Sequence, residues 1–322
     1  NEETGYIKIN RFSATTYEEF MKGLEKLVEK EQMEDLIIDL RHNPGGYLQE
    51  ATKILSELFK EKEKLMVYTE GRTVHRSDYE TKGRAYYKVD DIAILIDEGS
   101  ASASEILAGA IQDHDRGLII GRRSFGKGLV QEQYKLRDGS ALRLTVARYY
   151  TPSGRSIQKS FENRDAYDID LMERYNSGEL SSADNISIFD STKYYTASGR
   201  VVYGGGGITP DIFVSLDSVL MNEAYLELRQ HVPQFVYRFL DGHQENAYDN
   251  LDQFVEEYTV SQSAIDEFFA YAKEKGATVN RNIPPAAIDE LKRFIKARIS
   301  KHLVADEGFY AVWNKDDEMI RK

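Results

Sequence analysis

Three serines with a spacing of two residues, Ser100, Ser102 and Ser104, lie between a predicted buried strand and a predicted helix. A hydroxyl at this position lies near the partial positive charge of the helix N-terminus, where backbone N–H groups are free. Those groups can stabilise the oxyanion that develops during acyl transfer. Ser102 and Glu105 also fit a helix-capping box, which is the commoner role of a serine before a helix. The segment therefore predicts either a nucleophile or a simple cap.

A candidate base and a further hydrogen-bond donor lie in two other segments. None of the six histidines stands in the sequence context of a catalytic triad. Lys127 follows another predicted strand, and a lysine acts as a base when burial or a nearby cation lowers its pKa. The turn at Asn43–Gly46 has two glycines that permit close backbone approach, so it could supply an N–H. Together with the serines, these segments indicate nucleophilic catalysis.

Other chemistries fit the sequence less well. The chain contains no cysteine, which excludes disulfides, thiolate metal sites and cysteine nucleophiles. The histidines form no His-x-x-x-His pair, so we expect no metal site, and no motif predicts a cofactor. Gly204–Gly207 is not followed by the Lys-Ser/Thr pair of a phosphate loop, so we do not expect nucleotide binding.

The elements that must position these residues read as an α/β core. Nearly continuous apolar strands, typical of a parallel sheet buried on both faces, are expected at Leu36–Leu40, Ile92–Ile96 and Leu118–Ile120. Amphipathic helices join them, and the first helix is expected to begin at Thr15, with Glu18 completing a capping box. The candidate residues lie in three segments, the chemical segments: Asn43–Gly46, Ser100–Ser104 and the loop that contains Lys127. Because the carboxyl ends of parallel strands meet at one edge of a sheet, we expect these segments to lie close together.

The pattern changes beyond residue 129. Longer strands are expected at 129–134 and 142–149, and residues 160–205 form a polar excursion. The excursion contains Tyr194–Arg200, which nearly repeats Tyr149–Arg155. We interpret the repeat as two similar turns after strands, with two edges of one substrate groove as the alternative.

Two domains are expected, which agrees with the length of 322 residues. Residues 1–217 form the α/β core, and residues 218–322 show apolar stripes at helical spacing, which predict an all-helical module. Pro284–Pro285 is expected to start its last long helix. No motif in this module carries chemistry.

The charge balance argues against nucleic acid as a partner. The chain has 42 Lys+Arg against 54 Asp+Glu, for a formal net charge of −12, whereas binding a duplex requires clustered positive charge. No apolar run approaches the ~20 residues that cross a bilayer. Asn1–Thr4 is polar and acidic, unlike a signal peptide.

Three segments together resemble the C-terminal processing (tail-specific) peptidase family. They are Asp39–Gly46, Gly99–Ile106 and Gly126–Gln131, and the similarity extends over about residues 5–216. Members of this family are serine–lysine endopeptidases. The resemblance implies an α/β fold with a ClpP/crotonase-like core and a mainly parallel sheet. It also implies polypeptide substrates that are cleaved near their C-termini.

The resemblance implies a role for each matching residue. Ser102 would be the nucleophile, Lys127 the general base, and Gln131 would orient the lysine amine by a hydrogen bond. The oxyanion hole would consist of the N–H of Ala103 and an N–H of Gly45 or Gly46. The family implies no metal and no cofactor.

Family members usually carry a peptide-binding PDZ domain before the segment that begins here at Gly5. Either this member lacks that module, or the chain starts partway into a longer protein. We expect the second, with the protein exported to the periplasm or cell envelope and trimmed of its leader. A homo-oligomer is possible. Two other functions stay open: a noncatalytic binding module on the same core, and a crotonase-like acyl-CoA enzyme.

Overall fold

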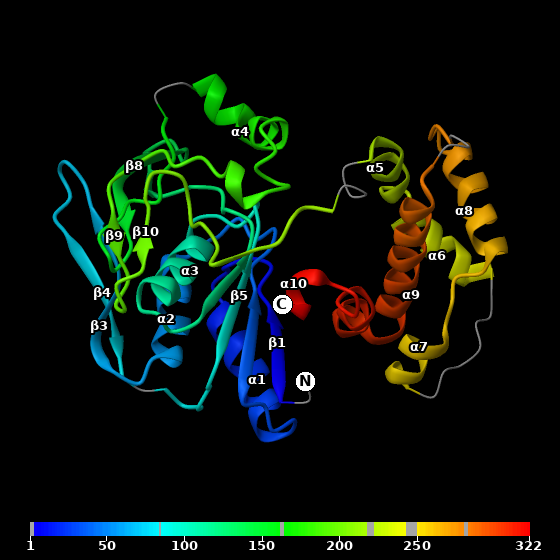
Figure 1. The fold of residues 1–322 in the computed structure, drawn as a ribbon, viewed down its shortest axis with the longest axis horizontal. Coiled ribbons are helices and arrows are strands. Elements are labelled where there is room, and N and C mark those ends of the chain that lie inside the picture. Colours follow the sequence, from blue (N-terminus) through cyan, green and yellow to red (C-terminus); the bar gives the residue numbers. More distant parts are fainter. Residues whose placement is uncertain (1–2, 84, 162–163, 218–221, 243–249, 280–282) are drawn as a thin grey trace. The chain divides into compact units, whose positions relative to one another are not determined.

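The computed structural model describes residues 3–83, 85–161, 164–217, 222–242, 250–279 and 283–322 (Figure 1). The chain divides into two compact units, Asn1–Ser215 (unit 1) and Leu216–Lys322 (unit 2). The domain boundary predicted after residue 217 adjoins residues 218–221, which lie outside the described residues.

Unit 1 is built on a five-stranded parallel sheet with the strand order β1-β2-β5-β6-β11. Its strands are β1 (Thr4–Lys8), β2 (Asp35–Asp39), β5 (Ile92–Ile96), β6 (Leu118–Gly121) and β11 (Ile212–Phe213). Every neighbouring pair runs parallel. The predicted α/β fold with a mainly parallel sheet is confirmed. The three strands that precede the chemical segments, β2, β5 and β6, are neighbours.

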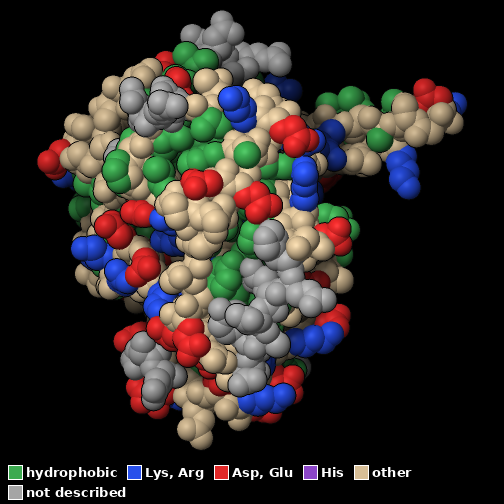
Figure 2. All heavy atoms as spheres, turned by 90° about the vertical axis from the view of Figure 1, so that its right-hand side faces the viewer, with side chains coloured by type: hydrophobic (Ala, Val, Ile, Leu, Met, Phe, Trp, Pro, Cys, Tyr) green, Lys and Arg blue, Asp and Glu red, His purple; other side chains and the backbone are tan. Residues whose placement is uncertain are grey.

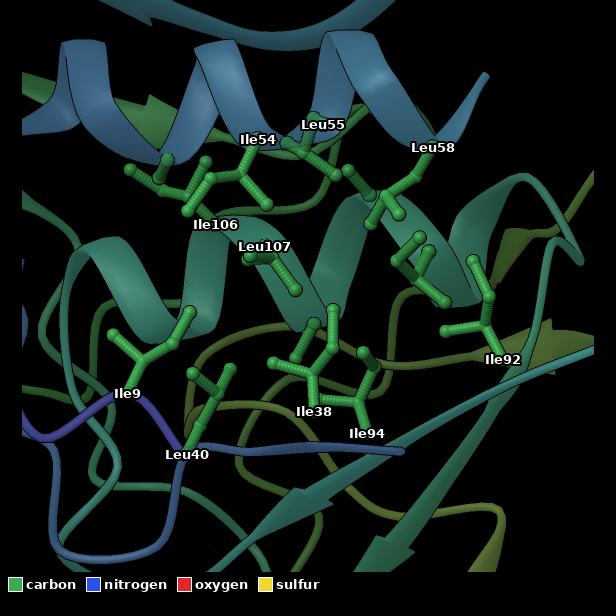
Figure 3. Packing of buried hydrophobic residues seen from close by; sticks show 14 of the residues in the cluster. Ile9, Ile38, Leu40, Ile54, Leu55, Leu58, Ile92, Ile94, Ile106 and Leu107 are labelled. Atoms are coloured by element: carbon green, nitrogen blue, oxygen red, sulfur yellow. The ribbon is translucent and has the colours of Figure 1, made fainter. Parts of the chain in front are cut away.

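Three helices pack with this sheet into one core: α1 (Thr16–Glu29), α2 (Leu48–Leu58) and α3 (Ala103–Asp113). Figure 3 shows α3 between α2 and the sheet, with Leu107 facing Ile38 and Ile94. These three side chains are fully buried. Burying each contributes roughly 1.5–3 kcal/mol, so α3 is held firmly on both sides.

The capping box predicted at the start of α1 is wrong. Thr15 is the N-cap residue, but its side chain makes no capping hydrogen bond. The Thr15 hydroxyl instead donates to Glu19 Oε1 at 2.7 Å, and Glu18 pairs with Lys22 one turn further on. The helix still begins where predicted, because its buried apolar stripe determines it.

A second, antiparallel sheet has the order β4-β3-β8-β7. Its strands are β3 (Lys62–Glu70), β4 (Ser77–Lys82), β7 (Leu129–Lys135) and β8 (Ala141–Tyr150). The sequence predicted β7 and β8, whereas the charged residues of β3 and β4 hid the other two strands. Only the last three residues of β3 pair with β8, so residues 131–145 project as a two-stranded ribbon.

One face of this ribbon carries exposed apolar side chains. Tyr134 lies opposite Leu142, and Glu132 lies opposite Leu144. Tyr134, Leu142 and Leu144 are 44%, 46% and 45% exposed. The alternation that predicted the strand was right, but nothing in the described part of the chain buries its apolar side.

The polar excursion adds α4 (Arg164–Asn176), the short 3₁₀ helix η1 (Ala183–Asn185), β9 (Tyr194–Tyr195) and β10 (Val201–Val202). Its repeated heptapeptide forms the predicted pair of similar turns. In each turn the threonine N–H donates to the arginine carbonyl, and the glycine N–H donates to the threonine carbonyl.

Both turns bind the C-terminal end of α3. The Ser153 N–H and the Arg155 guanidinium bond to Asp113 at 2.9 and 2.8 Å. The corresponding groups of Ser198 and Arg200 bond to Asp115 at 2.6 and 2.7 Å. The repeat therefore anchors the helix that begins after Ser102.

Unit 2 is helical, as predicted. It contains α5 (Glu223–Arg229), α6 (Val232–Gly242), α7 (Leu251–Glu257), α8 (Gln262–Glu274), α9 (Pro285–Trp313) and α10 (Glu318–Arg321). Its own core includes the fully buried Phe268 and Leu291. Backbone angles at Val304 and Ala305 are not helical, so α9 is two helices joined at a kink.

Surface charge is mixed on the face in Figure 2, where acidic and basic side chains are interspersed. Across the described residues, none of the helices combines the length and apolar character needed to cross a membrane. The same residues contain no group of three or more His, Cys, Asp or Glu that could hold a metal ion.

Candidate active site

The three chemical segments leave the parallel sheet at its carboxyl edge. Asn43–Gly46 follows β2, Ser102 follows β5, and Lys127 follows β6. Ser102 is the N-cap residue of α3 and has φ 57° and ψ −112°. A non-glycine residue held in such a conformation costs about 1–3 kcal/mol, and such strain is typical of a residue that a fold holds in place for function.

Ser102 and Glu105 form the predicted capping box of α3, and the other two serines are committed to buried hydrogen bonds. Ser100 and Ser104 are fully buried, and their hydroxyls donate to Leu40 O at 2.8 Å and Asn43 O at 3.1 Å. Ser102 is 8% exposed. The hydroxyl that retains access to solvent is therefore that of Ser102.

Ser102 also contacts Tyr149, at the end of β8. Burial raises the pKa of the Tyr149 hydroxyl, and a hydrogen bond with the Ser102 side chain opposes that rise. In the sequence, Tyr149 stood out only as the first residue of the repeated heptapeptide Tyr149–Arg155.

The buried Glu105 carboxylate joins the serine and lysine segments. Its Oε2 accepts the backbone N–H groups of Ser102 and Lys127, both at 2.8 Å. Its Oε1 accepts the Ser124 hydroxyl and the Gly126 N–H, both at 2.6 Å. Burial raises the pKa of Glu105, and these four hydrogen bonds oppose the rise. The predicted cap residue is thus a link between two loops, which sequence spacing alone could not reveal.

The shared oxygen fixes a short separation between the two backbones. Each nitrogen lies 2.8 Å from Oε2, so the nitrogens of Ser102 and Lys127 are no more than twice that distance apart. No hydrogen bond joins the Lys127 amine to the Ser102 hydroxyl among the described residues. The backbone is placed so that the flexible four-carbon lysine side chain can reach the serine.

The glycine turn packs directly on the serine. A Cβ added to Gly45 would lie 2.7 Å from Ser102 Cβ and 2.9 Å from Ala103 N, and Gly45 has a φ of +90°. Only glycine fits so close an approach at this φ. The turn and the start of α3 are therefore in van der Waals contact.

The two glycines differ as hydrogen-bond donors. The Gly45 N–H donates to Asn43 Oδ1 at 2.8 Å. The backbone N–H groups of Gly46 and Ala103 have no acceptor in the described part of the chain. Of the two alternatives for the second donor, Gly46 is the one whose N–H is available.

Asn43 locks this turn in place. Its side-chain amide donates to Ile9 O at 2.7 Å, and its backbone carbonyl accepts the Ala101 N–H at 2.9 Å. The turn is thereby tied to the loop that carries the serines.

Asp97, just after β5, binds His42, the residue that precedes the glycine turn. Its Oδ1 accepts the His42 N–H at 2.9 Å, and His42 Nδ1 lies 2.8 Å from its Oδ2. Burial alone would raise the pKa of Asp97, but hydrogen bonding and the charge of His42 lower it to about 2. The hydrogen bond with Asp97 raises the pKa of His42.

Gln131 lies on β7 opposite Thr145, beyond an irregularity in the ladder. Its side chain is exposed and makes no hydrogen bond to Lys127 among the described residues. The structure thus brings Ser102, Ala103, Gly45 and the Lys127 backbone together, and it leaves the orienting role of Gln131 a prediction.

The sequence was compared with profiles of known protein families. The profile of peptidase family S41 matches residues 3–167, which is half of the chain. The chain belongs to peptidase family S41. Its resemblance to the C-terminal processing peptidases is thereby confirmed. A second profile, of a family of unknown function, matches residues 224–305 within unit 2.

Individual relatives support the assignment to family S41. The chain is 40% identical over 158 residues to a carboxyl-terminal-processing protease of Picosynechococcus sp., covering 49% of this chain and 37% of that protein. It is 40% identical over 155 residues to the carboxy-terminal processing protease CtpB of Bacillus subtilis, covering 48% of this chain and 32% of that protein. The S41 chain thus spans about a third of the length of these relatives.

Among solved structures, the photosystem II D1 C-terminal processing protease is similar, at 27% identity and a TM-score of 0.47. The similarity covers 66% of this S41 chain and 42% of that chain.

Proposed function

We propose that this S41 chain is a serine endopeptidase that cleaves extended polypeptides near their C-termini. The observation that carries the proposal is the pair of backbone N–H groups, from Ser102 and Lys127, bound to one oxygen of Glu105. That arrangement supports the proposal because it holds the backbone of the candidate base close to that of the candidate nucleophile. The names of the relatives supply the preference for C-termini.

The proposed chemistry is acyl transfer through a serine–lysine dyad. Lys127, in its neutral form, removes the proton from the Ser102 hydroxyl as Oγ attacks the peptide carbonyl carbon. The oxyanion then forms facing the N–H groups of Ala103 and Gly46. Lys127 passes the proton to the leaving amine, and water hydrolyses the acyl-enzyme. Gln131 would orient the lysine amine once substrate is bound.

An extended substrate would add as a strand to an exposed sheet edge, where main-chain hydrogen bonds give affinity without a defined sequence. The family resemblance favours action in the periplasm or cell envelope, and this location is part of the proposal.

The direct test is cleavage of an unstructured protein with an apolar C-terminus by the wild type and by single variants. Ser102→Ala and Lys127→Ala should each lose measurable cleavage. Ser104→Ala should retain a folded, active protein, because that hydroxyl only donates to Asn43 O. If both dyad variants cleave at the wild-type rate, the assignment is wrong.

A further inference from the structure

The segment that leads into Lys127 is held from two sides. On one side Glu105 accepts the N–H groups of Gly126 and Lys127. On the other side the Arg174 guanidinium donates to three consecutive carbonyls, Arg123 O at 3.1 Å, Ser124 O at 2.9 Å and Phe125 O at 3.3 Å. Donors and acceptors of this segment are therefore bound by two buried groups of opposite charge.

Arg174 belongs to α4 in the polar excursion, beyond the residues that the S41 profile matches. Its side chain is 3% exposed and forms an ion pair with Asp170 at 3.0 Å. A planar guanidinium can span several carbonyls at once, which an ammonium cannot do. The contact is specific to arginine at this position.

Lys159 reinforces the same attachment. Its Nζ lies 3.0 Å from Asp170 Oδ2 and 4.1 Å from the centre of the Phe125 ring. Its backbone N–H donates to Gly126 O at 3.0 Å. The carbonyls of all four residues from Arg123 to Gly126 are thus bound by either Arg174 or Lys159.

The two faces of α4 agree with this role. Arg174 and Asp170 point inward, whereas Ile169, Leu171 and Met172 are 51%, 54% and 61% exposed. Soluble helices normally bury the apolar face. The inner face of α4 instead combines these two charged side chains with Tyr167, whose ring lies 6.0 Å from that of Phe125.

We propose that Arg174 is a positioning residue for Lys127: by binding the three carbonyls before it, Arg174 fixes the place from which the lysine amine acts. This inference rests on the proposed function for its effect on catalysis. A displacement of about 1 Å at a catalytic group can lower the rate about 10²-fold. The hydrogen bonds from Arg174 should therefore affect turnover as well as stability.

The test compares Arg174→Lys with Arg116→Lys. Arg116 also donates to three backbone carbonyls, of Leu58, Val89 and Asp90 at 2.9, 2.6 and 2.7 Å. It follows the C-terminal end of α3, whereas Ser102 caps the other end of that helix. Each variant keeps its positive charge and loses the planar fork, so the pair is matched.

We expect Arg174→Lys to lower kcat about 10- to 100-fold with little change in KM, and Arg116→Lys to leave both nearly unchanged. Equal turnover in the two variants would overturn the proposal.

Hydrogen exchange supplies a readout that needs no substrate. Amides of Gly126 and Lys127 should exchange faster in Arg174→Lys than in wild type, while those inside α3 keep their protection. Unchanged exchange at both amides would show that Arg174 does not hold this segment in place. If the wild type cleaves no polypeptide, the proposed function fails, and the exchange rates still decide whether Arg174 holds this segment.

Discussion

Glu105 Oε2 accepts the N–H groups of both Ser102 and Lys127, and Oε1 accepts two further donors. A glutamine at this position would turn one acceptor into a donor that faces other donors. Each such mismatch costs about 1–3 kcal/mol. We expect Glu105→Gln to lower the melting temperature and to abolish most labelling of Ser102 by a serine-reactive probe.

Glu50→Gln is the control for this change. Glu50 is also buried and accepts the Tyr17 N–H at 2.9 Å, but it lies on α2, outside the site. It should lose stability while labelling of the folded protein continues. Normal labelling of folded Glu105→Gln would contradict the role given to Glu105.

Gly45 tests the close approach of the turn. Gly45→Ala would place a Cβ 2.5 Å from Ala101 O and 2.7 Å from Ser102 Cβ, so the serine loop must shift. Such a shift displaces the Ser102 hydroxyl and the Ala103 N–H, and a displacement of about 1 Å at a catalytic group can lower the rate about 10²-fold, so we expect a loss of about that order in kcat.

Gly139→Ala provides the matched control, because Gly139 has a similar φ of +87° with nothing within 4 Å of the added Cβ. It carries the same backbone strain without the contact. If the two variants lose the same activity, strain alone explains the effect of Gly45→Ala.

The pair formed by His42 and Asp97 should make stability depend on pH. Folding raises the pKa of His42 and lowers that of Asp97 to about 2. The ion pair therefore contributes fully between about pH 4 and 6.5, the unfolded values of the two groups. It is lost as pH rises through the folded pKa of His42, and as pH falls toward about 2.

The His42 side chain is 79% exposed, so solvent limits the contribution to about 0.5 kcal/mol. His42→Gln should be less stable than wild type by about this amount near pH 5.5 and equally stable near pH 8.5, as measured by urea unfolding. A difference that stays constant across that range would show that the charge of His42 contributes nothing.

At the scale of elements, the projecting ribbon and the core should respond differently to the loss of apolar surface. Leu142 and Leu144 are nearly half exposed, so replacing both by serine should leave the melting temperature within a few degrees of wild type. Leu107→Ala in α3 should cost about 2–5 kcal/mol. Strong destabilisation by the ribbon substitutions would mean that a partner or another segment covers this face.

Elements with a plain periodic pattern could be predicted from the sequence. The strands β2, β5 and β6 each contain a run of three or more apolar residues, and α2 and α3 have clear apolar stripes, so the parallel core could be predicted directly. β3 and β4 were missed because charged side chains occupy much of their length, and their pairing depends on contacts distant in sequence. Propensity carries no such information.

The candidate site was predictable in part for the same reason. Ser102, Lys127 and the glycine turn stand next to strand ends, where topology brings them together. Arg174 and the second function of Glu105 could not be predicted, because their partners are backbone atoms of loops whose conformation no spacing rule gives. The repeated turns were recognisable, but their common target at the end of α3 was not.

At the scale of the whole molecule, each unit has its own buried core. Unit 2 buries Phe268, Leu291 and Ile295 completely, which is typical of a domain that folds alone. We expect a fragment of residues 216–322 to show helical circular dichroism and a cooperative thermal transition. A fragment without such a transition would show that unit 2 needs unit 1 to fold.

The inverted faces of α4 also bear on the order of folding. Hydrophobic burial contributes little to docking this helix on unit 1, because Ile169, Leu171 and Met172 are more than half exposed, although the Tyr167 ring lies 6.0 Å from that of Phe125. Its attachment depends on Arg174 meeting carbonyls of Arg123, Ser124 and Phe125, and those carbonyls converge only after β6 and the following loop have formed. α4 should therefore be among the last elements of unit 1 to dock and the first to detach on heating. The segment before Lys127 would then lose half of its support while the rest of the core is still folded, so catalytic competence should fail at a lower temperature than the fold itself.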